Sequence, residues 1–147
     1  MQAMSFGSGA NESYAIDGAP YTIFDTGSSH LMVPPLLFEP MIDNIIAATG
    51  GADYAIQQGM AFVNCREQYK FQPIKFMFSE YYITVKPEQY IWDAYGDGSV
   101  CTLLLLANSY DFFLLGQPIY QGYYTVHNMT ASTIAYVPLN QDGNPAL

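Results

Sequence analysis

An apolar run that leads into an Asp-Thr-Gly triplet constrains this sequence more than any other feature. Residues 22–24 predict a buried strand, and Gly27 offers a turn position at which the backbone can adopt a positive φ angle. We therefore expect the Asp25 carboxylate at the mouth of a strand-to-loop turn, among amide and hydroxyl donors. Such donors favour the ionised carboxylate, whereas burial favours the neutral acid.

The triplet by itself has two interpretations. Asp-Thr-Gly also occurs in ordinary surface turns, and three-residue motifs often match by chance. The other interpretation is a catalytic carboxylate, which the hydroxyls of Ser28 and Ser29 favour only modestly. The remainder of the chain has to decide between them.

Composition narrows the class of protein. The 147 residues suffice for one domain with a core of its own, and half of them are hydrophobic. The net charge is −9, with four Lys plus Arg against thirteen Asp plus Glu. Because so few basic side chains cannot neutralise a phosphate backbone, we exclude nucleic acid as a partner.

The sequence also bears on membranes and targeting. Its longest apolar run, residues 103–107, is far shorter than the roughly 18 residues of a membrane helix, so we expect no membrane span. Residues 1–6 lack the basic region and long apolar core of a signal peptide, so a targeting segment is expected outside this chain. Asn11 and Asn128 begin sequons and are candidate glycan acceptors in the secretory pathway.

The two cysteines, Cys65 and Cys101, are compatible with one disulfide or with two buried thiols. Neither belongs to a Cys-x-x-Cys pair, and the two histidines, His30 and His127, stand far apart. We therefore expect no zinc site, no other metal and no cofactor. Both histidines lie in strand patterns, which favours structural roles over catalysis.

Near the N-terminus the pattern predicts a hairpin. Residues 14–16 and 21–24 read as strands, and the turn signal at residues 17–20 lies between them. Asp17 precedes a Gly, which is typical of a turn residue and not of a second catalytic acid.

The one convincing helix is expected near residues 38–48. Glu39 and Pro40 suit its first turn, and Gly50 follows its end. Apolar residues recur there at three- and four-residue steps and form one stripe, which we assign to core packing: Met41, Ile42, Ile45 and Ile46.

From residue 60 onward the pattern is β. Alternation and turn signals predict strands over residues 60–63, 73–78, 81–85, 100–106, 112–116, 122–127 and 132–137, with hairpins joining 73–78 to 81–85 and 122–127 to 132–137. The polar stretch 140–147 predicts a loose tail. The chain is thus expected to be mostly β with one main helix, as a single unit of residues 1–139.

The order of these elements resembles the C-terminal lobe of the pepsin-like aspartic proteases over nearly the whole chain. Four features carry the resemblance: Asp25-Thr26-Gly27-Ser28-Ser29, the two cysteines around a pair of alternating strands, Phe113-Leu114-Leu115-Gly116, and the closing hairpin from Tyr123 to Val137. The resemblance implies a single lobe of that fold, with Cys65 and Cys101 joined in the disulfide characteristic of the lobe. Two positions depart from the usual lobe, which more often has Thr at Ser28 and commonly has Asp at Gln117.

By resemblance, the chain is one half of an aspartic endopeptidase that hydrolyses polypeptides. Such enzymes hold a water between two Asp from two similar lobes, so Asp25 is expected opposite an N-terminal-type lobe of the same precursor or of another chain. Thr26 should lock its loop against the equivalent loop, Gly27 permits the turn, and Ser28 should hydrogen-bond the carboxylate. Leu115-Gly116 should let a second segment approach the loop closely.

Alternatives stay open at this point. The chain carries a single Asp-Thr-Gly triplet, so an isolated copy should be inactive. A symmetric homodimer of the retroviral type would supply Asp25 twice, but it ranks lower because the chain has the C-terminal-lobe features and no obvious flap hairpin. A catalytically inactive lobe that serves as a structural or binding subunit is the third reading. The resemblance also implies a lysosomal, vacuolar or secreted location.

Overall fold

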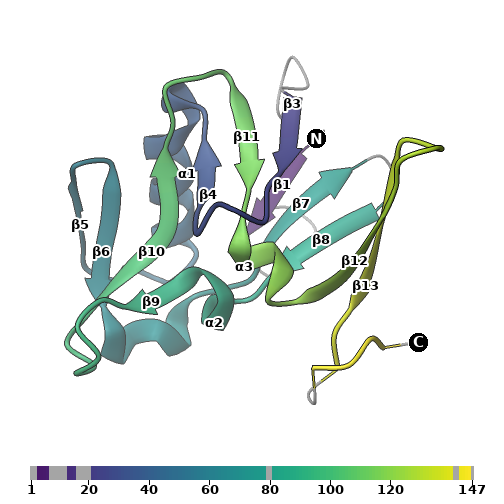
Figure 1. Cartoon of the computed structure of the whole chain (residues 1–147). Helices are drawn as coiled ribbons and strands as arrows, with labels where there is room; N and C mark the ends of the chain where they lie inside the picture. The colour runs from purple at the N-terminus through teal and green to yellow at the C-terminus, as the bar shows by residue number, and fades with distance from the viewer. Residues whose placement is uncertain (1–2, 7–12, 16–20, 79–80, 141–142, 147) are drawn as a thin grey trace.

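The computed structural model of the chain describes residues 3–6, 13–15, 21–78, 81–140 and 143–146 (Figure 1). Strands dominate these residues, and the one long helix among them is α1 (Pro35–Ala47), which confirms the predicted class. The strands are β1 (Ala3–Phe6), β2 (Ser13–Ala15), β3 (Tyr21–Phe24), β4 (Leu31–Val33), β5 (Tyr54–Gln57), β6 (Met60–Asn64), β7 (Ile74–Phe78), β8 (Tyr81–Val85), β9 (Ile91–Asp93), β10 (Val100–Ala107), β11 (Phe112–Leu115), β12 (Tyr123–Asn128) and β13 (Thr133–Pro138). The short helices are η1 (Cys65–Lys70, a 3-10 helix), α2 (Pro87–Tyr90) and α3 (Gln117–Tyr120).

The described strands form three sheets. A four-stranded antiparallel sheet has the order β2-β1-β7-β8, and a larger sheet has the order β3-β11-β4-β10-β6-β5, with β9 also paired to β10. Within the larger sheet, β3 runs parallel to β11, and β4 runs parallel to β10. The predicted hairpins β7–β8 and β12–β13 are both present, and Figure 1 shows β12–β13 along one side of the molecule.

The predicted hairpin near the N-terminus is wrong. β2 pairs with β1, in the four-stranded sheet, whereas β3 pairs with β11 in the larger one. A turn signal marks a change of direction but does not say which strands pair, and parallel pairing with β11 places Phe24 against the core. Residues 16–20, and with them the interpretation of Asp17, lie outside the described residues.

The helix α1 begins earlier than predicted. Pro35 occupies the first helical turn, where its missing N–H is no loss and its fixed φ already suits the helix. Pro40 and the exposed Glu39 therefore lie inside the helix and not in its first turn. The predicted apolar stripe is buried as expected, and Phe38 extends it.

One core joins this stripe to the middle of the larger sheet. α1 lies against β10, and buried residues of the central strands β4, β10 and β11 belong to the same cluster: Leu31, Val33, Leu103, Leu105, Phe113 and Leu115. The edge strand β5 escaped prediction because all four of its side chains are exposed, so it shows no buried face.

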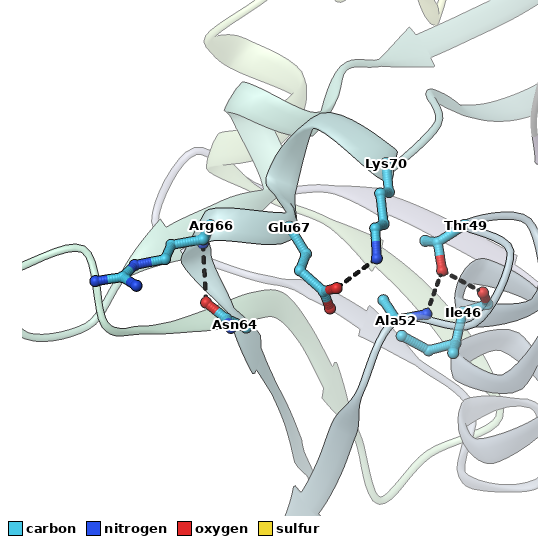
Figure 2. A network of polar contacts seen from close by, with 7 residues as sticks. All are labelled: Ile46, Thr49, Ala52, Asn64, Arg66, Glu67 and Lys70. Atoms are coloured by element: carbon cyan, nitrogen blue, oxygen red, sulfur yellow. Dashed lines mark hydrogen bonds and ion pairs between the residues drawn. The ribbon is translucent and has the colours of Figure 1, made fainter.

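A disulfide joins Cys65, at the start of η1, to Cys101 in β10, as the family resemblance implied. Next to it, the Asn64 side chain accepts a hydrogen bond from the Arg66 amide (3.0 Å), and Glu67 pairs with Lys70 (Figure 2). The disulfide therefore ties a capped helical turn to a central strand.

Beyond β13, the described residues 143–146 turn back on the chain. The Ala146 amide donates to the Pro138 carbonyl (2.8 Å), and a bridge pairs Leu139 with Pro145. The division into a lobe of residues 1–139 and a loose tail of residues 140–147 stays a prediction.

Replacing both Cys65 and Cys101 by Ser should lower the free energy of unfolding by about 3–4 kcal/mol, because the bridge closes a long loop in the unfolded chain. The cysteines stand 36 positions apart. Urea unfolding followed by circular dichroism measures the effect, and the unmodified chain in excess reductant should behave like the double variant. An unchanged midpoint in both samples would contradict the prediction.

Candidate active site

The Asp25 loop connects β3 to β4 and continues the pairing of β3 with β11. Phe24 lies opposite Leu115, and one residue further the Asp25 amide donates to the Leu115 carbonyl (3.1 Å). The backbone of Asp25 is thus held by a buried strand, while its side chain is partly exposed.

The amide of Gly27 donates to Oδ1 of Asp25 (2.9 Å), and the Ser28 amide lies 3.4 Å from the Asp25 carbonyl oxygen that it bonds. The loop therefore turns tightly enough to orient its own carboxylate. Gly27 does not have the positive φ that we predicted. It suits the site because a β-carbon there would approach Asp25 Oδ1 to 3.2 Å, a tight contact.

A second segment crosses this loop at Gly116, directly after β11. A β-carbon on Gly116 would overlap the carbonyl oxygens of Ser28 and His30, so only glycine fits without a shift. The next amide, of Gln117, donates to the Ser28 carbonyl (2.8 Å). This is the close approach that the resemblance implied for Leu115-Gly116.

The Ser28 hydroxyl does not make the predicted hydrogen bond to the Asp25 carboxylate. Its side chain is buried, and its hydroxyl donates to the His30 carbonyl (3.3 Å) and accepts from the His30 amide (3.4 Å). A hydroxyl has a single proton, which is used here within the loop and not on the Asp25 carboxylate. The reason is local, because the Gln117 amide holds the Ser28 carbonyl while the Ser28 hydroxyl bonds the backbone of His30, just before β4.

The sequence reasoning missed a contact between Ser29 and His30. The Ser29 hydroxyl lies 3.0 Å from Nδ1 of His30, and burial lowers the pKa of this imidazole from its ordinary value of 6.5. The only available signal was adjacency in the sequence. The second histidine, His127, is exposed in β12 and takes no part in the loop.

An aromatic layer lies behind the loop. The ring of Phe24 packs on Tyr136 (centroids 5.1 Å apart) and on Phe78 (5.6 Å). These rings, with residues of β8 and β12, line a cavity of about 590 Å³. Sequence reasoning did not find this cavity, because its walls come from strands that are distant in the chain.

Two of the remaining predicted positions, Thr26 and Asn128, are exposed. Thr26 is exposed, and its role in locking a second loop stays a prediction. Asn128 is exposed at the end of β12, where its side chain accepts from the Ala131 amide (3.0 Å), and Asn11 lies outside the described residues.

The described residues bring a single carboxylate to this loop. They contain no cluster of three or more His, Cys, Asp or Glu side chains that could hold a metal. Nor does this part of the chain contain a helix long and apolar enough to cross a membrane. What the loop itself offers is one acid, oriented by an amide and partly open to solvent.

Comparison with known proteins adds to this geometry. The family model for eukaryotic aspartyl protease matches residues 3–139 of the chain. The chain belongs to that family. Among curated proteins, pepsin B of Canis lupus familiaris is 29% identical over 117 residues, an alignment that covers 78% of this chain and 28% of pepsin B. The chain therefore spans little more than a quarter of the length of pepsin B. The two matches confirm the resemblance to a pepsin-like lobe.

In this aspartyl protease lobe, Gly116→Ala should lower the free energy of unfolding by about 3 kcal/mol, because the new methyl group must push two carbonyl oxygens apart. Gly96→Ala is the matched control. A β-carbon added at Gly96 would have no atom within 4 Å, so only the positive φ of this residue opposes alanine. That control should lose about 1 kcal/mol. Equal losses in the two variants, measured by urea unfolding, would show that the crossing at Gly116 is not tight.

His30→Gln should make the stability of the lobe less dependent on pH. Because burial lowers the pKa of His30, the unfolded chain binds the proton more readily, and stability is lost as the pH falls below 6.5. Unfolding free energies between pH 7.5 and pH 5 should therefore decline less steeply in the variant. The exposed His127→Gln serves as the control and should keep the original slope; an unchanged slope in His30→Gln would refute the assignment.

Proposed function

We propose that this lobe supplies one of the two catalytic carboxylates of an aspartic endopeptidase, and that the carboxylate is Asp25. One observation carries the proposal: in a chain of the aspartyl protease family, the loop that bears Asp25 is held in place by a second segment that crosses it closely at Gly116. The Gly27 amide orients the carboxylate, and its partial exposure leaves it accessible to a partner group.

The chemistry needs a second acid. Two carboxylates at close range cannot both ionise, so such a pair shares one proton across the acidic range. The ionised member takes a proton from a water held between them, and the protonated member donates to the carbonyl oxygen of the peptide. Water attacks the carbonyl carbon directly, so no covalent enzyme intermediate is needed.

The second acid is proposed to come from another lobe. This chain spans 28% of the length of pepsin B, so its match leaves most of that relative uncovered. We place an N-terminal-type lobe, from the same precursor or from another chain, opposite Asp25, with the exposed Thr26 at the contact. In this arrangement the present lobe is of the C-terminal type.

The secretory pathway is the proposed site of maturation, with a lysosomal, vacuolar or secreted destination. The Cys65–Cys101 disulfide supports it, because disulfides persist in oxidising compartments. Asn128 is exposed and heads a sequon, so we propose it as a glycan acceptor.

Asp25→Asn should abolish peptide hydrolysis by the assembled enzyme, with a loss of kcat of about 10³-fold or more, because an amide cannot take part in the shared-proton pair. Cleavage of a peptide library at about pH 4, where such a pair shares its proton, measures the effect. The exposed Asp111→Asn is the matched control and should retain activity.

The same preparation separates the alternatives when particle mass is measured with and without a second lobe. Activity only with a second lobe supports the proposal, and activity of a dimer of this chain alone would replace it with the homodimer. A partner that binds, with no hydrolysis that depends on Asp25, would show instead a structural or binding subunit.

A further inference from the structure

The hydroxyl of Ser29 and the imidazole of His30 form a hydrogen-bonded pair on the loop that carries Asp25. Ser29 Oγ lies 3.0 Å from Nδ1 of His30. Among the described residues, neither this hydroxyl nor the imidazole ring has another hydrogen-bond partner. The proposed chemistry of Asp25 does not use the pair, so its purpose is open.

The imidazole of His30 is carried by a fixed backbone. A β-carbon on Gly116 would overlap the carbonyl oxygen of His30, and the Ser28 hydroxyl bonds both the amide and the carbonyl of His30. Leu31 then opens β4, which pairs with β10 on one side and with β11 on the other. The ring therefore stands beside Ser29 on a segment that is held from the core.

Protonation of His30 reverses the hydrogen bond. A neutral imidazole carries one proton, and an imidazolium carries one on each nitrogen. When His30 is neutral with its proton on Nε2, Nδ1 accepts the proton of the Ser29 hydroxyl. When His30 is charged, Nδ1–H donates to Ser29 Oγ instead, and the hydroxyl proton is free to bond a third group. Ser29 thus becomes an outward donor only in the charged state.

This reversal belongs to the acidic range. Burial lowers the pKa of His30 from its ordinary value of 6.5, so the ring gains its proton at a more acidic pH than an exposed histidine does. A pair of aspartates that shares one proton also works in the acidic range. The charged state of His30 and the working state of the proposed enzyme therefore coincide.

Other titratable groups near His30 do not set its charge. The strands β10 and β11, which flank β4, carry no side chain that titrates, because Cys101 belongs to the disulfide. Burial is the one cause of the shifted pKa of His30, with no contribution from a neighbouring charge. The titratable side chains on the loop, on α1 and on α3 are Asp25, Glu39, Asp43 and Tyr120.

We propose that the Ser29 hydroxyl donates to a main-chain carbonyl oxygen of the polypeptide substrate at acidic pH, and that His30 is the positioning residue that frees the hydroxyl for this bond. The inference rests on the proposed function, which brings a polypeptide to the Asp25 loop. Ser29 is exposed on this loop and Asp25 is partly exposed, whereas Ser28 between them is buried. A carbonyl oxygen only accepts hydrogen bonds, so it needs the donor that the charged state of His30 releases.

Nitrogen-15 NMR of the histidine side chains tests the premise on the whole chain without any assay of activity. At pH 7.5 the Nδ1 atom of His30 should be unprotonated, because it accepts from Ser29. A proton on Nδ1 at this pH would overturn the proposal. The exposed His127, whose ring has no hydrogen-bond partner among the described residues, is the control and should show a mixture of both tautomers.

The same spectra measure how strongly Ser29 favours the charged ring. Ser29→Ala should lower the pKa of His30 by about half a unit, because a charge-assisted bond from the imidazolium is stronger than the neutral bond that it replaces. The titration of His127 should not move. An unchanged titration of His30 in this variant would also overturn the proposal.

The effect on substrate is measured as KM in the assembled enzyme. Between about pH 4 and pH 6, KM of the unmodified enzyme should rise about fivefold as His30 loses its proton, because one hydrogen bond to the substrate is lost. Ser29→Ala should have the high KM throughout, with kcat nearly unchanged, and Ser29→Thr should restore the rise. His30→Leu should have the low KM throughout, since nothing then holds the hydroxyl back.

The opposite levels of KM in the two flat profiles separate this role from a merely structural one, which would raise KM in both variants. A rise that survives in His30→Leu would refute the positioning role, and His127→Leu should keep the rise as the control. An unmodified enzyme without hydrolysis would count against the proposed function alone, since the NMR measurements need no activity.

Discussion

The Asp25 loop keeps its shape because a second segment crosses it at a distance that leaves no room for a β-carbon. At this crossing Gly116 lies against the carbonyl oxygens of Ser28 and His30, and the adjoining amides continue the hydrogen bonds of β3 and β11. The loop is therefore anchored from the core side, where strands are buried. On its open side lies the Asp25 carboxylate, whose orientation depends on one hydrogen bond from the Gly27 amide (2.9 Å).

The surroundings of the loop differ from the rest of the core. The core that the larger sheet shares with α1 is mostly aliphatic, whereas Phe24, Phe78 and Tyr136 form an aromatic layer beside a cavity of about 590 Å³. The buried hydroxyl of Tyr136, which has no hydrogen-bond partner among the described residues, belongs to this layer. A cavity and an unpaired hydroxyl thus adjoin the residue before Asp25, and such departures from ideal packing are common where function outweighs stability.

Much of the fold could be predicted from the sequence because it depends on local pattern. Alternation marked β7 and β8, and a helical stripe marked α1. The partner of β3 could not be predicted, since a turn signal carries no information about tertiary pairing. The start of α1 was misplaced because Glu39 and Pro40 were assigned to its first turn, although Pro35 suits that position equally well.

The candidate site, like the fold, could be predicted from the sequence only in part. The Asp-Thr-Gly motif located the loop, and the family resemblance supplied the disulfide and the crossing at Gly116. The acceptor of the Ser28 hydroxyl could not be predicted because it depends on the exact conformation of the loop. The contacts of Tyr136 with Phe24 could not be predicted because they depend on how separate segments pack. Side-chain hydrogen bonds of this kind follow the tertiary structure and leave no periodic signal.

The central claim is that Asp25 works opposite a second aspartate, and an experimental structure of the assembled particle tests it most directly. We predict that the Asp25 carboxylate lies within reach of another carboxylate through a single shared water, with the second group on a separate lobe. An assembled particle in which Asp25 faces bulk solvent, or a partner surface without an acid, would contradict the account.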